Sequence, residues 1–119
     1  MKKILIVDDE PEVCAILSKK LETEGFECLS ASDGVEGIKK TRDHKPDLIL
    51  LDIIMPGKDG FSMLNEIQQD QDLREIPVIM VSAKSESDSL FKGQNLGATD
   101  YLIKPVDFRQ LLKYIRKYT

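Results

Sequence analysis

The sequence has few of the residues that build thiolate metal sites, disulfides or histidine chemistry. It contains two cysteines, Cys14 and Cys28, and one histidine, His44. The cysteines do not form a Cys-x-x-Cys pair and have no histidine nearby in the chain, so we expect reduced cytosolic thiols packed in or beside the core. His44 falls in the turn-like stretch RDHKPD, where no predicted helix presents it to a partner. We therefore do not expect it to carry a phosphoryl group.

Long apolar runs and an excess of positive charge are also missing. The run Ile4–Val7 stops at Asp8, too short for a signal-peptide core, and no later stretch could span a bilayer. The 17 basic and 21 acidic residues give a net charge of −4. Four basic residues fall on the polar side of the last predicted helix: Arg109, Lys113, Arg116 and Lys117. We expect them to form a solvated face near the helix C-terminus, and we predict a cytoplasmic protein without direct nucleic-acid or membrane contact.

The chain alternates regularly between strand and helix patterns. Short apolar runs predict five strands, at Lys2–Val7, Phe26–Ala31, Asp47–Leu51, Pro77–Val81 and Asp100–Ile103. Apolar residues at helical spacing predict five helices, around Val13–Leu21, Val35–Arg42, Phe61–Ile67, Leu90–Leu96 and Phe108–Ile115. This order predicts an α/β fold with a doubly wound parallel sheet and helices on both faces. We expect residues 1–119 to form one domain, either standing alone or cut from a longer chain.

Polar residues follow four of the predicted strands directly. Asp8 and Asp9 follow the first strand, Asp52 the third, Ser82 the fourth and Lys104 the fifth. Ligands of open parallel sheets bind beyond the carboxyl ends of the strands, where strand order reverses. If the first and third strands are neighbours, roughly 4.8 Å apart, three carboxylates converge on one small volume.

Three adjacent carboxylates require a counter-charge. A like-charge pair about 4 Å apart costs on the order of 4 kcal/mol at an effective dielectric constant of about 20. Oxygen ligands without cysteine or histidine favour a hard divalent ion, Mg²⁺ or Mn²⁺. The alternative is that these acids are solvated loop residues, with Asp8 or Asp9 capping the first helix.

Lys104 and Ser82 indicate what such a metal would serve. A metal ion and a lysine can neutralise the oxygens of a phosphoryl group, and a serine can donate a hydrogen bond to it. Asp52 would then be the nucleophile that forms an acyl phosphate. Taken singly, Lys104 fits a surface ion pair and Ser82 fits a strand-end hydroxyl, so the hypothesis depends on their combination.

Four stretches, ILIVDDE, PDLILLDIIMPGKDG, VIMVSA and GATDYLIKP, resemble the response-regulator receiver domain of two-component signalling. They occur in the same order and at the same spacing, and the resemblance covers essentially the whole chain. It implies a flavodoxin-like (βα)5 fold with strand order 2-1-3-4-5. It also implies a protein that takes a phosphoryl group from a sensor histidine kinase or histidine phosphotransfer protein and controls a downstream partner or fused output domain. Such a protein catalyses only its own phosphorylation and dephosphorylation, and is a monomer or a weak phosphorylation-dependent dimer.

The resemblance assigns roles by position. Asp52 matches the phosphoacceptor. Asp8 and Asp9 match the acidic pair that holds Mg²⁺, with Asp9 as the direct ligand and Asp8 acting mainly through water. Asp52 itself and the backbone carbonyl of Ile54 complete the implied ligands, and Lys104 matches the phosphate-contacting lysine.

Further positions match the switching parts of the family. Ser82 corresponds to the switch hydroxyl and Tyr101 to the switch aromatic, and their movement would alter the surface formed by the fourth helix, fifth strand and last helix. The bond between Lys104 and Pro105 corresponds to a cis peptide. Ile54 and Lys84 correspond to positions that tune the acyl-phosphate lifetime, and an apolar Ile54 predicts slow self-hydrolysis. Thr99 stands where one large subclass has an acid, which puts that subclass's charged dimer contact in doubt.

Three other functions compete with this interpretation. Haloacid-dehalogenase-like phosphohydrolases need a second aspartate two residues after the nucleophile, and Ile54 stands there. Flavin or nucleotide binders cradle phosphate with glycines and hydroxyls after the first strand, where this chain has DDEPE. A binding module independent of phosphorylation is disfavoured because every chemical position is filled.

Overall fold

The computed structural model describes residues 1–52, 60–82 and 97–119. The strands are β1 (Lys3–Val7), β2 (Glu27–Ala31), β3 (Leu48–Leu51), β4 (Val78–Ser82) and β5 (Asp100–Ile103). The helices are α1 (Pro11–Thr23), α2 (Gly34–His44), α3 (Gly60–Gln69) and α5 (Phe108–Tyr118). The helix predicted around 90–96 lies outside the described residues. Within the described ranges, no helix combines the length and apolarity that a bilayer crossing requires.

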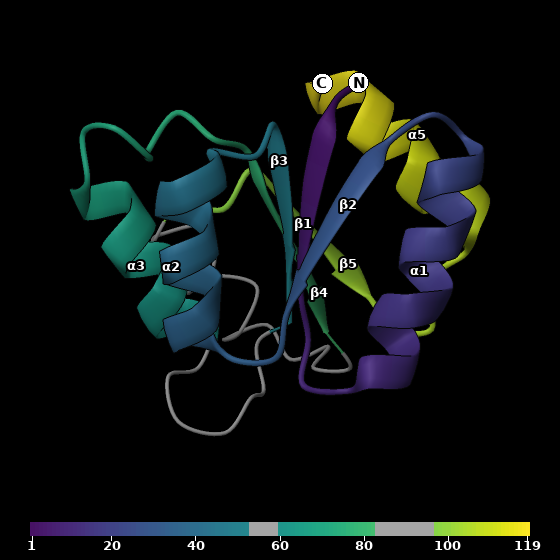
Figure 1. Ribbon diagram of the computed structural model, residues 1–119, viewed down its shortest axis with the longest axis horizontal. Coiled ribbons are helices and arrows are strands. Elements are labelled where there is room, and N and C mark those ends of the chain that lie inside the picture. The colour runs from purple at the N-terminus through teal and green to yellow at the C-terminus, as the bar shows by residue number, and fades with distance from the viewer. Residues whose placement is uncertain (53–59, 83–96) are drawn as a thin grey trace.

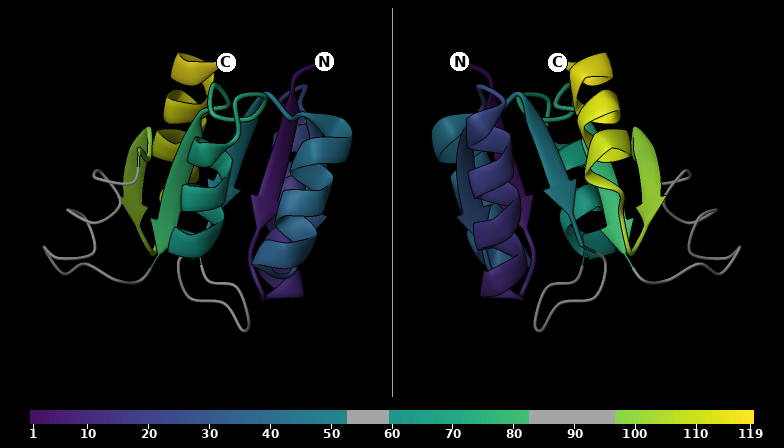
Figure 2. Two further views of the ribbon diagram at one scale, coloured as in Figure 1. Left: turned by 90° about the vertical axis from the view of Figure 1, so that its left-hand side faces the viewer. Right: turned by 90° about the vertical axis from the view of Figure 1, so that its right-hand side faces the viewer.

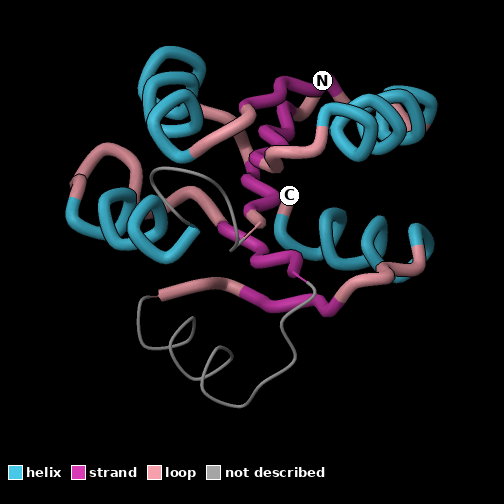
Figure 3. Tube along the Cα trace, turned by 90° about the horizontal axis from the view of Figure 1, so that it is seen from below, coloured by secondary structure: helices cyan, strands magenta, loops and turns pink. Residues whose placement is uncertain are grey.

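The five strands form one parallel sheet in the order β2-β1-β3-β4-β5, which confirms the predicted fold class and strand order. Central β1 aligns Leu5 with Leu29 on one side and with Ile49 on the other. Helices α2 and α3 cover one face of the sheet, and α1 and α5 cover the opposite face (Figures 1 and 3). Because all five strands run in the same direction, their carboxyl ends lie at the same edge of the sheet.

Two apolar clusters fill the space between the sheet and its helices. The cluster under α2 and α3 includes the completely buried Leu51, Met63 and Ile67. The cluster under α1 and α5 includes Leu21 and Ile115, which are also completely buried. Burial of one such side chain stabilises the fold by roughly 1.5–3 kcal/mol, so both faces of the sheet contribute to stability.

Helices α2 and α3 pack against each other at very close range. Gly37 of α2 has no side chain, and a Cβ there would lie 2.8 Å from Met63 Sδ and 3.3 Å from Val7 Cγ1. A larger residue at this position would have to displace the flexible end of the Met63 side chain and would crowd Val7 of β1. The packing therefore favours glycine here, and the backbone conformation does not require it.

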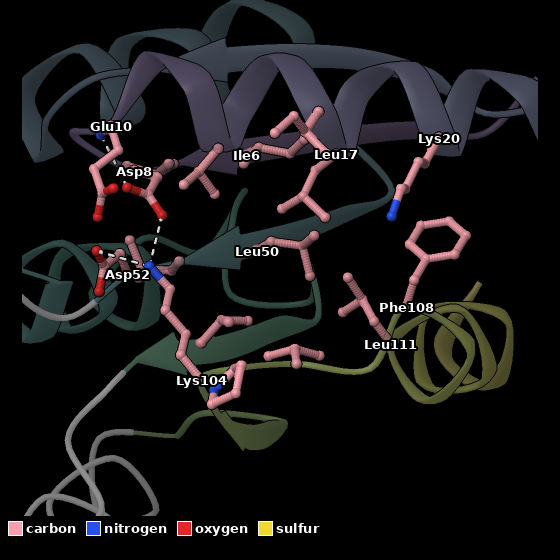
Figure 4. A pocket seen from close by; sticks show the side chains of 17 residues that line it. Ile6, Asp8, Glu10, Leu17, Lys20, Leu50, Asp52, Lys104, Phe108 and Leu111 are labelled. Carbon is pink, nitrogen blue, oxygen red and sulfur yellow. Dashed lines mark hydrogen bonds and ion pairs between the residues drawn. The ribbon is translucent and has the colours of Figure 1, made fainter.

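On the opposite face of the sheet, a cleft of about 610 Å³ lies between α1 and the segment leading into α5. Its apolar walls include Leu17, Leu50 and Leu111, as the close view in Figure 4 shows. Two contacts join α1 and its C-terminal turn to α5. The Lys20 ammonium lies 5.4 Å from the centre of the Phe108 ring, and Arg116 pairs with Glu24 at 2.9 Å. Figure 2 shows both helices on this side.

The helix ends differ from some sequence expectations. Pro11 begins α1, and the cap position is Glu10 with no capping side chain, so the alternative that Asp8 or Asp9 is the cap residue of α1 is wrong. Helix α2 does have a capping side chain, because the Asp33 carboxylate accepts a hydrogen bond from the Glu36 N–H at 2.8 Å. An aspartate cap of this kind contributes about 1 kcal/mol to helix stability.

Both cysteines are free thiols packed in or beside the core, as predicted from the sequence. Burial raises the pKa of Cys14, and burial followed by the charge of Glu22 raises the pKa of Cys28 to about 11. Thiols with raised pKa values stay protonated near neutral pH and react slowly.

Candidate functional site

The two aspartates at the ends of β1 and β3 are both buried, at 5% and 7% exposure for Asp8 and Asp52. Their main chains continue the sheet for one more residue. The Asp8 N–H donates to Ala31 O at 3.0 Å, and the Asp52 N–H donates to Val7 O at 2.9 Å. Because β1 and β3 are neighbours, this extension fixes the two carboxylates on the same edge of the sheet, as the sequence predicts.

Lys104 joins these two carboxylates. Its Nζ lies 3.0 Å from Asp8 Oδ2 and 3.5 Å from Asp52 Oδ2, and Figure 4 shows the ammonium between them. Burial works to lower the pKa of Lys104, but the hydrogen bond to Asp8 and the charge of Asp52 outweigh it, so the pKa lies above its usual value. The Lys104–Pro105 peptide is cis, the configuration that the resemblance implies.

Glu10 belongs to the same site, although the sequence analysis gave it no role. Its main-chain N–H donates to Asp8 Oδ1 at 3.0 Å. Its carboxylate also groups with those of Asp8 and Asp9, with one oxygen of each within 4.8 Å of the others. The adjacency of the three acids in DDE was the available sequence signal for the grouping.

Cys14 of α1 contacts the main chain of Asp8. Its buried thiol donates to the main-chain oxygen of Asp8 across 3.6 Å. The N–H, the carbonyl and both carboxylate oxygens of Asp8 therefore all have partners within the protein. No sequence pattern indicated this contact, because it depends on how α1 returns over the end of β1.

The donor set fits a hard divalent cation. Asp8, Asp9 and Glu10 offer only carboxylate oxygens, and Asp52 lies on the other side of the shared Lys104 ammonium. Four acids near one lysine leave an excess of negative charge that a divalent ion would offset. Carboxylate oxygens are the ligands that Mg²⁺ prefers.

The structure describes only some of the remaining residues to which the resemblance assigns a role. Ile54 and Lys84 lie outside the described residues. Ser82 ends β4, but its side chain is not part of the description. Tyr101 lies in β5, is partly buried and packs against the α2–α3 cluster. Thr99 accepts a hydrogen bond from the Val78 N–H at 3.0 Å, so its hydroxyl fastens the start of β4 to the residue before β5.

Residues 4–116 match the sequence model of the family described as the response regulator receiver domain. The chain belongs to the response-regulator receiver family. This receiver domain is 43% identical over 115 residues to the protein PilH of Pseudomonas aeruginosa, covering 97% of this chain and 95% of PilH.

Two further relatives cover almost the whole chain. The alkaline phosphatase synthesis transcriptional regulatory protein PhoP of Bacillus subtilis is 40% identical over 110 residues, covering 92% of this chain and 45% of PhoP. This receiver domain thus spans about half the length of that regulator. The chemotaxis protein CheY4 of Vibrio cholerae has the same fold, with a TM-score of 0.92 and 29% identity, covering 100% of this chain and 99% of the CheY4 chain.

The family membership decides between the functions considered from the sequence. Receiver domains are phosphorelay components of two-component signalling, and the receiver function predicted from the sequence is confirmed. The hydrolase, the flavin or nucleotide binder and the phosphorylation-independent module have no comparable support. The family is a signalling family, not an enzyme family.

Proposed function

We propose that this receiver domain accepts a phosphoryl group on Asp52 from a sensor histidine kinase or a histidine phosphotransfer protein, in a Mg²⁺-dependent reaction. The observation that carries the proposal is the buried Asp52 carboxylate, which shares the Lys104 ammonium with Asp8. A carboxylate fixed at a strand end beside a retained cation is suited to attack a phosphorus atom whose charge must be neutralised.

In this reaction an oxygen of Asp52 attacks the phosphorus of a phosphohistidine. The P–O bond to Asp52 forms as the P–N bond to the donor breaks, and the leaving imidazole keeps the bonding electrons and takes up a proton. Lys104 neutralises negative charge on the transferred oxygens, at a position close to where its Nζ now lies. Asp8 positions the ammonium, because it holds Lys104 through Oδ2 while its other polar atoms are engaged elsewhere.

The metal ligands in this proposal are Asp8, Asp9, Asp52 and the main-chain carbonyl of Ile54. A bound Mg²⁺ would supply positive charge that stabilises the phosphoryl oxygens during transfer. Glu10 adds a fourth carboxylate to the same edge and fixes Asp8 Oδ1 through its main chain.

Phosphorylation would change the outer surface through a population shift. The phosphoryl oxygens attract the Ser82 hydroxyl and the Lys104 ammonium, and Tyr101 fills the space vacated behind Ser82. The surface containing the fourth helix, β5 and α5 then changes and controls a partner or a fused output domain. Ile54 and Lys84 set the acyl-phosphate lifetime, and the apolar Ile54 gives slow self-hydrolysis. Residues 1–119 act in this scheme as one domain.

Incubation with acetyl phosphate and Mg²⁺ followed by intact mass measurement tests the proposal. We expect one phosphoryl adduct that hydroxylamine removes. The adduct is absent in Asp52→Asn and present in Asp43→Asn, a matched change at an exposed aspartate of α2. An adduct that persists in Asp52→Asn would contradict the assignment. Turnover of a generic phosphate ester without an adduct would favour the hydrolase instead.

A further inference from the structure

Asp100, the first residue of the edge strand β5, binds two parts of the molecule with its two carboxylate oxygens. Its Oδ1 accepts a hydrogen bond from the main-chain N–H of Tyr101 at 2.8 Å. Its Oδ2 accepts a hydrogen bond from the phenol of Tyr118 at 3.0 Å. One carboxylate therefore links the backbone of Tyr101 to Tyr118, which lies 18 positions after Asp100 in the chain.

Tyr118 is the last residue of α5, so the Asp100–Tyr118 hydrogen bond fastens the end of this helix to the start of β5. The last turn is also closed locally, since Thr119 donates to the Ile115 carbonyl through its N–H at 3.0 Å and through its hydroxyl at 2.8 Å. The hydrogen bond to Asp100 raises the pKa of Tyr118, which keeps its phenol protonated and able to donate.

The two tyrosines lie on opposite faces of the sheet. Tyr101 packs against the α2–α3 cluster, whereas Tyr118 packs against the α1–α5 cluster. Successive residues of a strand point to opposite faces, so the carboxylate of Asp100 lies on the α5 side while the Tyr101 ring lies on the other. Asp100 is thus the described residue whose side chain connects the Tyr101 backbone with α5.

We propose that Asp100 and Tyr118 are positioning residues for the phosphorylation switch, which transmit a rearrangement at Tyr101 to the last turn of α5. This inference rests on the proposed function, because it takes Tyr101 as the residue that moves. If the backbone of Tyr101 moves, one of two things follows. Either the hydrogen bond from its N–H to Asp100 Oδ1 breaks, or the Asp100 carboxylate moves together with Tyr101. Either movement alters the bond that Oδ2 makes with Tyr118 and therefore the environment of the α5 C-terminus.

The test uses NMR of ¹⁵N-labelled protein. It compares how far amide chemical shifts move in two variants when Mg²⁺ and beryllofluoride, a mimic of the phosphoryl group, are added. In Tyr118→Phe, we expect the chemical-shift response of the amides of Lys117 and Thr119 to fall by roughly twofold or more, while the adduct yield at Asp52 is unchanged. Tyr114→Phe is the matched control, because Tyr114 lies one turn earlier on α5 and packs against the same cluster. Its response should equal that of the wild type.

A second variant separates the hydrogen bond from the packing of the ring. Asp100→Asn keeps the side-chain shape but offers one carbonyl oxygen in place of two carboxylate oxygens, so it should weaken the α5 response as Tyr118→Phe does. A full wild-type response in both variants would overturn the inference, as would an equal loss of Asp52 phosphorylation and α5 response. If no protein, including the wild type, binds beryllofluoride or forms an adduct, the proposed function itself fails.

Discussion

Two parts of this molecule place one basic side chain between two acidic ones, with different consequences. At the carboxyl edge of the sheet, Lys104 pairs with Asp8 and Asp52 at 3.0 and 3.5 Å, and the acid side chains are 6% and 9% exposed. Between α2 and α3, Arg42 pairs with Glu66 and Asp70 at 3.8 and 3.6 Å, with the arginine side chain 51% exposed. The charge patterns are alike, but access to water differs.

The difference in solvent access determines what each group of charges can do. Water and salt screen the charges around Arg42, so the ion pairs there contribute little to stability. Solvent screens the charges of Lys104, Asp8 and Asp52 much less, because these side chains are more buried. Hydrogen bonds to Glu10, Cys14 and Ala31 also fix the position of Asp8. Strong fixed charges of this kind are what phosphoryl transfer requires, whereas a solvated pair only holds two helices loosely together.

The largest expected contrast is in phosphorylation. Lys104→Met removes the cation between Asp8 and Asp52, and loss of one preorganised stabilising group lowers a rate by roughly 10²-fold. Arg42→Met removes the matching cation between α2 and α3 and should leave the rate of adduct formation from acetyl phosphate unchanged. Time-resolved intact mass measures both rates. Equal slowing in the two variants would mean that burial of the charges does not determine the rate of adduct formation.

Magnesium should distinguish the two groups by thermal stability. An ion that binds only the folded state adds about 2.7 kcal/mol at a concentration of about 100 Kd. We expect Mg²⁺ to raise the Tm of the wild type by several degrees, and Asp9→Asn to abolish most of this increase. Asp70→Asn, which changes an acid of the exposed group, should keep it. Calorimetric scans with Mg²⁺ and with EDTA provide the measurement, and an undiminished shift in Asp9→Asn would remove that residue from the metal site.

Alkaline pH should weaken only the buried group. The folded-state pKa of Lys104 lies above the ordinary value of 10.5, so its stabilising contribution is fully present below that value and is lost as pH rises through the folded pKa. Urea unfolding of the wild type and Lys104→Met from neutral to strongly alkaline pH gives the difference in unfolding free energy. We expect this difference to stay constant below pH 10.5 and to change only above it. A change near neutral pH would assign the effect to another group.

The smallest effect is expected at Arg42. Because its side chain is half exposed, Arg42→Met should change the unfolding free energy by less than about 1 kcal/mol. That difference should disappear in about 1 M salt, where charges are screened beyond about 3 Å. Urea unfolding at low and high salt is sufficient for the comparison. A difference that survives high salt would show that the arginine stabilises α2 and α3 through packing instead of charge.

Much of the fold and part of the site could be predicted from the sequence, because both depend on regular patterns. The apolar runs predicted the strands, and the right-handed rule for crossovers then restricted the sheet. Asp8, Asp52 and Lys104 follow strands directly, so the fold alone brings them together. The first four strands each begin one residue later than predicted, and β4 also ends one residue later, at Ser82. Before β3, Asp47 already bonds to Lys3 twice, through its N–H to Lys3 O at 2.8 Å and through its carboxylate to the Lys3 N–H at 2.7 Å.

The contacts missed by sequence reasoning depend on main-chain atoms or on distant packing. Glu10 fixes Asp8 with its N–H, which every residue except proline possesses, so the residue type carries no signal. Cys14 reaches the carbonyl of Asp8 only because α1 returns over β1. Tyr118 bonds to Asp100, 18 positions earlier in the chain, and no local pattern encodes a contact between the end of α5 and the start of β5.

The missing side chain at Gly37 bears on how Asp8 is held in this protein. A Cβ at Gly37 would meet the Met63 side chain of α3 and the Val7 side chain of β1, so α2 comes closest to the sheet where β1 ends. Val7 directly precedes Asp8, so the close approach of α2 helps to hold the chain at the point where the first buried aspartate leaves the sheet.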